Sequence, residues 1–289
     1  MAGLGGCGGR PQEFRWKLVR YNHTRDAVVV RRVLKIAKPK FGHSRRCKPR
    51  TGRTEDVSTE SYIGRWMSLE ARYRQVQERI ARAAEGAKRD PASITLLAVT
   101  KKFPPDVLCA AYDLGMREFG ENYVQEFEGK HPLLPKWPDA RFHLIGHLQS
   151  NKARKAASLF QTIQTVDSAR LAKRLDEAGE KLDVMIEVKL SEDEESKHGA
   201  APAELGAIVS AIRECGNLKL LGLMSIPPWS TDPELPRPYF QQLRALAAEH
   251  GLTQLSMGMS NDLETAIEEG STIVRVGTAL FGPRMKPLA

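Results

Sequence analysis

The chain has 289 residues, of which 41% are apolar and 27% charged, and this globular balance excludes a collagen-like or wholly disordered protein. No apolar run approaches the roughly 18 residues of a membrane-spanning helix, so no membrane partner is expected. The four cysteines are far apart and form no CxxC pair, which argues against a disulfide scaffold or zinc ribbon and predicts a cytoplasmic protein.

The net charge of +9 belongs to the N-terminal segment. Residues 1–54 hold 15 Lys and Arg residues but only two acids, Glu13 and Asp26, which gives this segment a charge of +13. Because the whole chain carries +9, the remaining residues carry −4. A uniform nucleic-acid-binding face on the rest of the chain is therefore not expected.

Residues 1–66 are predicted to be a basic, poorly ordered extension. Their Arg-rich, acid-poor composition is also typical of an organellar transit peptide or a nucleic-acid-binding tail, and both remain alternatives. Residues 67–289 are expected to form a single domain. Its first helix is predicted to start at Ser68, a good capping residue, and to end at Gly86, because apolar residues between them recur at helical spacing.

From residue 94 onward, short β-rich runs alternate with helix-forming stretches. Several runs are continuously apolar, as strands covered on both faces are. Eight strands alternating with helices predict a parallel sheet, and eight is the number that closes a (β/α)8 TIM barrel. An open doubly wound sheet is the alternative, although no GxGxxG follows the first strand. The expected strands are 94–100, 118–122, 141–146, 162–166, 183–190, 218–225, 254–260 and 272–278, and the expected helices include 106–114, 150–159, 168–178, 202–215, 238–250 and 262–268.

The first candidate functional residue is Lys101, which closes an otherwise apolar strand. In such barrels the functional residues lie at the C-terminal ends of the strands. A partly desolvated lysine has a lowered pKa, and its neutral amine can form a Schiff base with an aldehyde. The alternative is that Lys101 and Lys102 only mark where the strand leaves the core.

The second candidate is an anion site after the last two strands, the customary phosphate site of this fold. Gly258 and Gly277 allow backbone N–H groups to approach an anion, and Ser260 and Thr278 add hydroxyl donors. Ordinary turn glycines and helix caps are the alternative. Arg275 lies within a buried apolar strand and therefore needs a partner, either a structural carboxylate or a ligand atom.

Other polar groups give weaker signals. His143 and His147 are four residues apart, but without an HExxH motif a structural role is favoured over a metal site. The acidic run 192–195 is predicted to be a solvated loop. No metal site is expected.

A lysine on the first strand, a phosphate site after the seventh and eighth, and an arginine on the eighth converge on pyridoxal 5′-phosphate (PLP). Residues ~67–284 resemble the pyridoxal phosphate homeostasis protein family (the YggS/PROSC type). The matching segments are 98–101 (AVTK), 119–126 (FGENYVQE), 143–152 (HLIGHLQSNK), 195–199 (ESKHG), 222–227 (GLMSIP), 256–260 (SMGMS) and 270–282 (GSTIVRVGTALFG).

This resemblance implies a fold-type III barrel, like the barrel half of alanine racemase, that holds PLP as an internal aldimine. Position by position, it implies that Lys101 is the Schiff-base lysine and that Asn122 lies beside the ring. An arginine at the pyridine nitrogen would keep that nitrogen unprotonated, which weakens the ring as an electron sink. The cofactor-binding residues implied in this way are Lys101, Asn122, Met224, Ser260, Arg275, Gly277 and Thr278, of which Ser260, Gly277 and Thr278 hold the phosphate and Arg275 faces the pyridine nitrogen. Among the few departures from the family pattern, Asn261 stands where aspartate is common, and Lys189 stands where asparagine is common and adds a cation at a strand end.

The function implied by the resemblance is intracellular PLP homeostasis without substrate turnover. Apo forms of PLP-dependent enzymes are the implied acceptors, and a monomer or weak dimer is expected. A PLP-dependent amino-acid racemase is the alternative. Racemases of this type add a β-rich domain with a tyrosine base, for which the seven residues after Gly282 leave no room. An RNA-associated role of residues 1–66 rests on charge alone.

Overall fold

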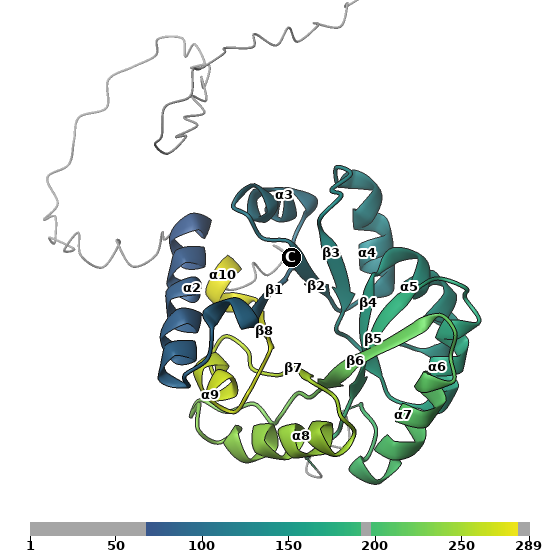
Figure 1. Ribbon diagram of the computed structural model, residues 1–289. Helices are drawn as coiled ribbons and strands as arrows, with labels where there is room; N and C mark the ends of the chain where they lie inside the picture. The colour runs from purple at the N-terminus through teal and green to yellow at the C-terminus, as the bar shows by residue number, and fades with distance from the viewer. Residues whose placement is uncertain (1–67, 192–197, 283–289) are drawn as a thin grey trace, which may run out of the picture. The chain divides into compact units, whose positions relative to one another are not determined.

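Eight parallel strands close into a barrel in the computed structural model, which describes residues 68–191 and 198–282 (Figure 1). Each strand pairs with its neighbours in chain order, and β1 pairs with β8, with Thr95 opposite Ile273. This closure confirms the predicted (β/α)8 barrel and rules out the open sheet. The strands are β1 Thr95–Val99, β2 Glu118–Glu121, β3 Arg141–Leu144, β4 Thr162–Val166, β5 Leu182–Glu187, β6 Leu218–Met224, β7 Gln254–Ser256 and β8 Ile273–Val276.

Helices surround the barrel on its outside (Figure 1). As predicted, the first begins at Ser68, whose side chain accepts a hydrogen bond from the Ala71 amide. Helix α4 was not predicted from the sequence, because it is only seven residues long and contains Gly129. The helices are α2 Leu69–Gly86, α3 Pro105–Asp113, α4 Val124–Lys130, α5 Ala153–Leu159, α6 Ala169–Asp176, α7 Leu205–Arg213, α8 Arg237–Glu249, α9 Leu263–Glu268 and α10 Thr278–Phe281.

The apolar core has two parts, which the alternation of side chains along each strand explains. Residues such as Ala98 and Phe119 pack outward against the helices in the larger cluster. Leu97 and Val99 point the other way and belong to a smaller cluster of strand and strand-end residues inside the barrel. This inner cluster fills the barrel below its C-terminal end, so the barrel is a packed core with room for a ligand only at its mouth.

Several strands end earlier than predicted. The apolar pattern suggested strands to residues 146, 190, 260 and 278, but β3, β5, β7 and β8 end at Leu144, Glu187, Ser256 and Val276. The residues that follow leave the sheet and form the loops at the C-terminal end of the barrel. Their apolar character reflects burial within these loops, which a sequence pattern cannot distinguish from burial within a strand.

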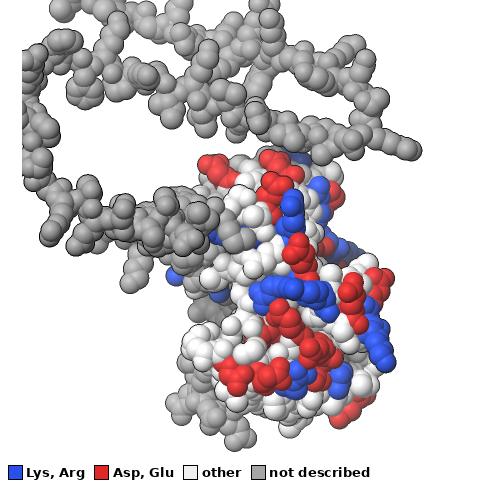
Figure 2. Space-filling view, turned by 90° about the vertical axis from the view of Figure 1, so that its left-hand side faces the viewer, with Lys and Arg blue, Asp and Glu red and all other residues white. Residues whose placement is uncertain are grey.

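The face shown in Figure 2 carries acidic and basic side chains that are interspersed. One pair of opposite charges among the described residues is Arg79 on α2 and Glu264 on α9, whose Nε and Oε1 atoms are 2.6 Å apart. This face of the described residues therefore presents no uniform basic surface.

Two sequence-based predictions lie outside the described residues: the extension 1–66 and the solvated acidic loop 192–195. Within the ranges that the structure describes, no helix has the length and apolar character needed to cross a membrane.

We expect a chain that begins at Met67 to fold and to bind ligand like the full chain. The described residues by themselves close the barrel, including the pairing of β1 with β8. The midpoint of thermal unfolding and the PLP content of the shortened chain should both match those of the full chain. A fall of several degrees in the midpoint would show that residues 1–66 stabilise the barrel.

Candidate functional site

A cavity of ≈340 Å³ opens at the C-terminal end of the barrel. The loops that follow β1, β2, β3, β6, β7 and β8 all contribute to its wall. It brings together six of the residues predicted from the sequence, namely Lys101, Asn122, Ser260, Arg275, Gly277 and Thr278.

Lys101 reaches this cavity because of the turn that follows β1. The strand ends at Val99, Thr100 is fully buried, and Lys101 lines the cavity. Lys102, which has a left-handed backbone with φ of 64°, is not among the lining residues. The structure therefore distinguishes the two adjacent lysines.

Arg275 projects from β8 to the cavity and is only 4% exposed. Its Nη1 donates to the carbonyl oxygen of Ser256 (2.6 Å) and to the hydroxyl of that residue (2.8 Å), and its Nη2 donates to the carbonyl oxygen of Ser225 (2.9 Å). These partners are neutral groups of the chain itself, and none of them is the structural carboxylate considered from the sequence. Burial lowers the pKa of Arg275 to about 10, against the opposing effect of Asp262 and Glu187, so the side chain is a cation at neutral pH.

A chain of buried hydrogen bonds continues from Arg275 through the barrel interior. The Ser256 hydroxyl donates to Gln164 Oε1 (2.7 Å), and Gln164 Nε2 lies 3.0 Å from His143 Nδ1. With Gln164 as donor, His143 carries its proton on Nε2, which lies 2.5 Å from a carboxylate oxygen of Glu118. His143 thus has the structural role that its spacing favoured.

The loops after β6, β7 and β8, which include the predicted anion-binding residues, are joined to one another by hydrogen bonds. The Ser260 hydroxyl accepts a hydrogen bond from the Ala279 amide (3.2 Å), which links the β7 loop to α10. Asn261 Nδ2 donates to the carbonyl oxygen of Ser230 (3.0 Å), which links the β7 loop to the β6 loop. Gly258 has φ of 89°, and a Cβ atom there would lie 2.5 Å from Cβ of Ala266, so only glycine fits.

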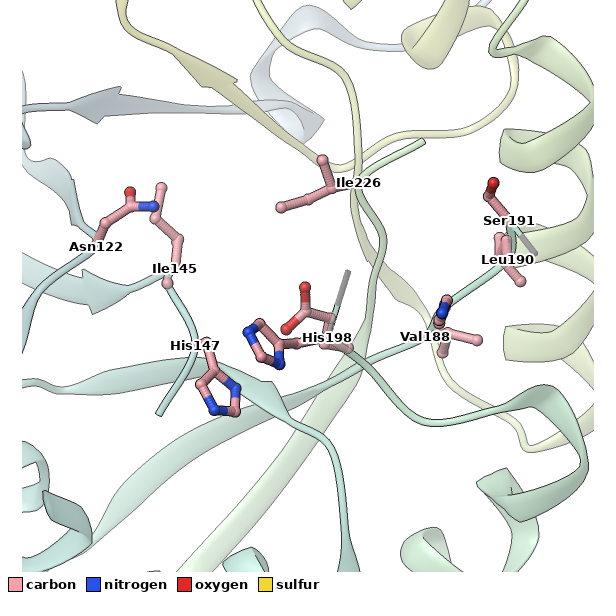
Figure 3. A pocket seen from close by; sticks show the side chains of 11 residues that line it. Asn122, Ile145, His147, Val188, Leu190, Ser191, His198 and Ile226 are labelled. Atoms are coloured by element: carbon pink, nitrogen blue, oxygen red, sulfur yellow. The ribbon is translucent and has the colours of Figure 1, made fainter. Parts of the chain in front are cut away.

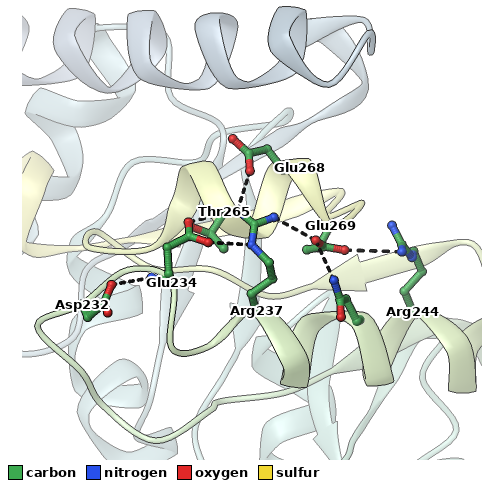
Figure 4. A network of polar contacts seen from close by, with 8 residues as sticks. Asp232, Glu234, Arg237, Arg244, Thr265, Glu268 and Glu269 are labelled. Atoms are coloured by element: carbon green, nitrogen blue, oxygen red, sulfur yellow. Dashed lines mark hydrogen bonds and ion pairs between the residues drawn. The ribbon is translucent and has the colours of Figure 1, made fainter.

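A cluster of charges anchors the β6 loop at its far end (Figure 4). Arg237, the first residue of α8, contacts Glu234 in the loop (2.7 Å) and Glu269 just after α9 (2.8 Å). Thr265 of α9 donates to Glu234 (3.1 Å). The β6 loop is therefore held at both ends against the segment that follows β7.

Met224 is the predicted site residue that the structure does not bring to the cavity. It is fully buried in the inner cluster with Val99 and Ile145, which themselves line the cavity. The β6 loop contributes Ile226, Trp229 and Ser230 to the lining instead, which the sequence reasoning missed. Trp229 is 75% exposed, and an aromatic residue after two prolines at a strand end was the available signal.

A smaller cavity of ≈180 Å³ adjoins the first and shares Asn122, Ile145 and Ile226 with it (Figure 3). Its wall includes the stacked rings of His147 and His198, whose centroids are 3.6 Å apart. Burial, followed by the nearby His198, lowers the pKa of His147.

The smaller cavity also holds polar groups that the strand-end pattern did not identify. Glu187, the last residue of β5, is 7% exposed, and burial raises its pKa to about 7. Lys189 lines this cavity and not the larger one. Among the described residues, the buried Oδ1 of Asn122 and Oγ of Ser191 have no hydrogen-bond partner. Asn122 lines both cavities and so lies between this polar group and the cavity that Lys101 and Arg275 line.

Comparison with known proteins places this barrel in a class. Residues 71–285 match the family model described as "Alanine racemase, N-terminal domain". The alanine racemase of Corynebacterium glutamicum superposes with a TM-score of 0.55 over 74% of this chain and 64% of that chain, at 19% identity, a likeness of fold alone.

Within this class, higher identity defines the family. The "Pyridoxal phosphate homeostasis protein" of Pseudomonas aeruginosa is 46% identical over 73% of this chain and 93% of its own. The structure of PipY from Synechococcus elongatus "with PLP bound" is 40% identical, with a TM-score of 0.63 over 71% of this chain and 100% of that chain. The chain belongs to the pyridoxal phosphate homeostasis protein family.

Proposed function

We propose that this protein binds PLP in the larger cavity, holds it reversibly and so helps to set its free concentration in the cytoplasm. The observation that carries the proposal is the convergence of Lys101 and Arg275 on one cavity, next to the loops after β7 and β8. The name of the Pseudomonas aeruginosa relative and the PLP bound to PipY support the same ligand. Apo forms of PLP-dependent enzymes are the proposed acceptors, and the protein is proposed to act as a monomer or weak dimer.

The groups around the cavity fit the chemistry of PLP. When bound, PLP supplies an aldehyde that condenses with an amine to form a C=N bond with loss of water. Lys101 offers the amine. Ser260 and Thr278 offer hydroxyl groups, and Gly277 offers an uncrowded backbone to a phosphate. Asn122 lines the same cavity, and its buried Oδ1 has no hydrogen-bond partner among the described residues, so its side chain would be able to reorient toward a bound ring.

Arg275 would donate a hydrogen bond to the ring nitrogen from a side chain whose position is fixed. Its three hydrogen bonds to Ser256 and Ser225 fix the guanidinium plane. A guanidinium group has donors and no acceptor, so it stabilises an unprotonated ring nitrogen. An unprotonated nitrogen makes the ring a weaker electron sink, which favours holding the cofactor over carbanion chemistry.

The titratable residues of the lining support a carrier over a racemase. Racemisation needs a proton donor or acceptor on each face of the bound amino acid. The described residues that line the larger cavity include three titratable groups: Lys101, Arg275 and Asp262. Asp262 Oδ1 already accepts a hydrogen bond from the Met259 amide (2.6 Å). Glu187, His147 and His198 line the adjoining smaller cavity and not the larger one, so Lys101 is the base that we propose for the chemistry.

The test combines PLP binding with hydrogen exchange at the α-carbon of amino acids. We expect the purified protein to bind PLP, with an absorbance band that borohydride abolishes, and to exchange the α-protons of L-amino acids in deuterated water no faster than free PLP does. Rapid exchange that saturates with the amino acid and disappears in Lys101→Ala would contradict the carrier function and establish an enzyme. Free PLP at the same concentration is the control.

A further inference from the structure

We propose that Glu126 and Lys130 of α4 are positioning residues, which hold the turn that carries Lys101 and thereby aim its amine at the aldehyde of PLP. They act with Glu121, the last residue of β2, in a largely buried ionic cluster that we call the clamp. This inference rests on the proposed PLP binding at Lys101 and adds to it the residues that direct the lysine.

The clamp contacts the backbone on both sides of Lys101. On one side, Lys130 Nζ donates to the carbonyl oxygen of Thr100 (3.1 Å). On the other side, the amide of Lys102 donates to Glu126 Oε1 (2.5 Å). The two halves are joined because Lys130 Nζ also donates to the same Glu126 oxygen (3.0 Å). Lys101 is therefore the central residue of a turn whose two flanking peptide groups are fixed by one helix.

Glu121 is the third residue of the clamp. Its Oε1 accepts hydrogen bonds from Lys130 Nζ (2.8 Å) and from the Thr100 hydroxyl (2.8 Å). Glu121 is fully buried, and Lys130 is 6% exposed. The clamp thus fixes both the side chain and the carbonyl group of the residue before Lys101.

The backbone of Lys102 shows why this turn needs support. Its φ of 64° lies in the left-handed region, which a residue with a Cβ atom adopts at a cost. This conformation reverses the chain immediately after Lys101, and the hydrogen bond from the Lys102 amide to Glu126 stabilises it. The Phe103 amide also donates to the Thr100 carbonyl oxygen (3.1 Å) and closes this turn. Loss of the bond to Glu126 is therefore expected to loosen the turn and to shift the direction of the Lys101 side chain without opening the turn.

The composition of the clamp favours a role in geometry over one in stability. Burying the Glu121 carboxylate and the Lys130 ammonium group removes both from water, whereas the Glu126 side chain stays 26% exposed. An apolar cluster in place of such a buried pair is often as stable. Burial raises the pKa of Glu121 even though Lys130 opposes the rise, and the second oxygen of Glu121 has no partner among the described residues. What the ionic groups provide, and apolar groups do not, is directed hydrogen bonds to the peptides around Lys101.

The test compares PLP with pyridoxine 5′-phosphate, which carries an alcohol in place of the aldehyde and cannot condense with an amine. In Glu126→Ala we expect the affinity for PLP to fall about tenfold, the equivalent of one lost hydrogen bond. The affinity for pyridoxine 5′-phosphate should stay within about twofold, because that ligand does not use the Lys101 amine. Glu126→Gln should restore most of the PLP affinity, since its amide oxygen still accepts from Lys102.

Two further variants make the comparison specific. Glu128→Ala is the matched control, because Glu128 lies on the same helix and pairs with Lys155 in a half-exposed contact of 2.7 Å; both affinities should be unchanged. Glu126→Asp keeps the charge but shortens the side chain, and it takes the place of Glu126→Ala if that variant does not fold. If Glu126→Ala lost affinity for both ligands equally, or lost affinity for neither, the proposed role of the clamp would be overturned.

A measurement without ligand separates this inference from the proposed function. If the unmodified chain binds neither ligand, the proposed function fails and the clamp is judged by lysine reactivity alone. Acetylation followed by mass spectrometry gives the ratio of the rates at Lys101 and Lys102. This ratio should change severalfold in Glu126→Ala and stay constant in Glu128→Ala. An unchanged ratio in both variants would refute the positioning role.

Discussion

Lys101→Ala is expected to abolish the borohydride-stable attachment of PLP while leaving the barrel folded. The side chain supplies the amine at the cavity, and Thr100 and Lys102 on either side keep their backbone hydrogen bonds when it is removed. PLP should still bind without a covalent bond through the loops after β7 and β8. Its affinity should fall about tenfold or more, since the C=N bond no longer contributes.

Lys102→Ala is the matched control for this prediction. Lys102 is adjacent in the chain, but it lies outside the lining of the cavity. Peptide mapping after borohydride reduction should place the adduct on Lys101 in the unmodified protein and in Lys102→Ala. An adduct on Lys102, or on Lys189 in the smaller cavity, would contradict the assignment.

The second large effect concerns Glu187 and the dependence of stability on pH. Burial raises the pKa of Glu187 from its ordinary value of 4.5 to about 7, against the opposing effect of Arg275. Folding therefore takes up a proton at this residue between pH 4.5 and about pH 7. Because the folded state binds the extra proton, the free energy of unfolding decreases as the pH rises through this window and stays lower above it.

Glu187→Gln should remove this loss, because an amide stays neutral throughout. A shift of this size corresponds to about 3 kcal/mol, so the variant should gain up to that amount over the unmodified protein between pH 5 and pH 8. Urea unfolding of the ligand-free proteins at pH 5, 6, 7 and 8 measures the difference. Glu249→Gln, an exposed position at the end of α8, is the control and should follow the unmodified protein. If the free energy of unfolding changed with pH in the same way for Glu187→Gln and for the unmodified protein, the prediction would be disproved.

The sequence by itself determined the fold class and the residues that carry the proposed chemistry. Eight apolar runs alternating with helical stretches predict a closed parallel barrel, because each signal is local and repeats along the chain. The same pattern made Lys101 and Arg275 candidates, and the family resemblance supplied the roles predicted for them. A charged residue at the end of an apolar strand, or within one, can be recognised as unusual from the sequence alone, before its neighbours in space are known.

The tertiary structure alone decided which strand-end residues reach the cavity and what holds them there. Met224 is the last residue of β6, and the alternation of side chains turns it into the barrel interior, whereas the loop that follows carries Trp229 to the rim of the cavity. The contacts of Lys130 with Thr100, and of Arg275 with Ser225, join residues that are 30 and 50 positions apart. Such partners are set by closure of the barrel and by the packing of helices against it, which no local pattern records.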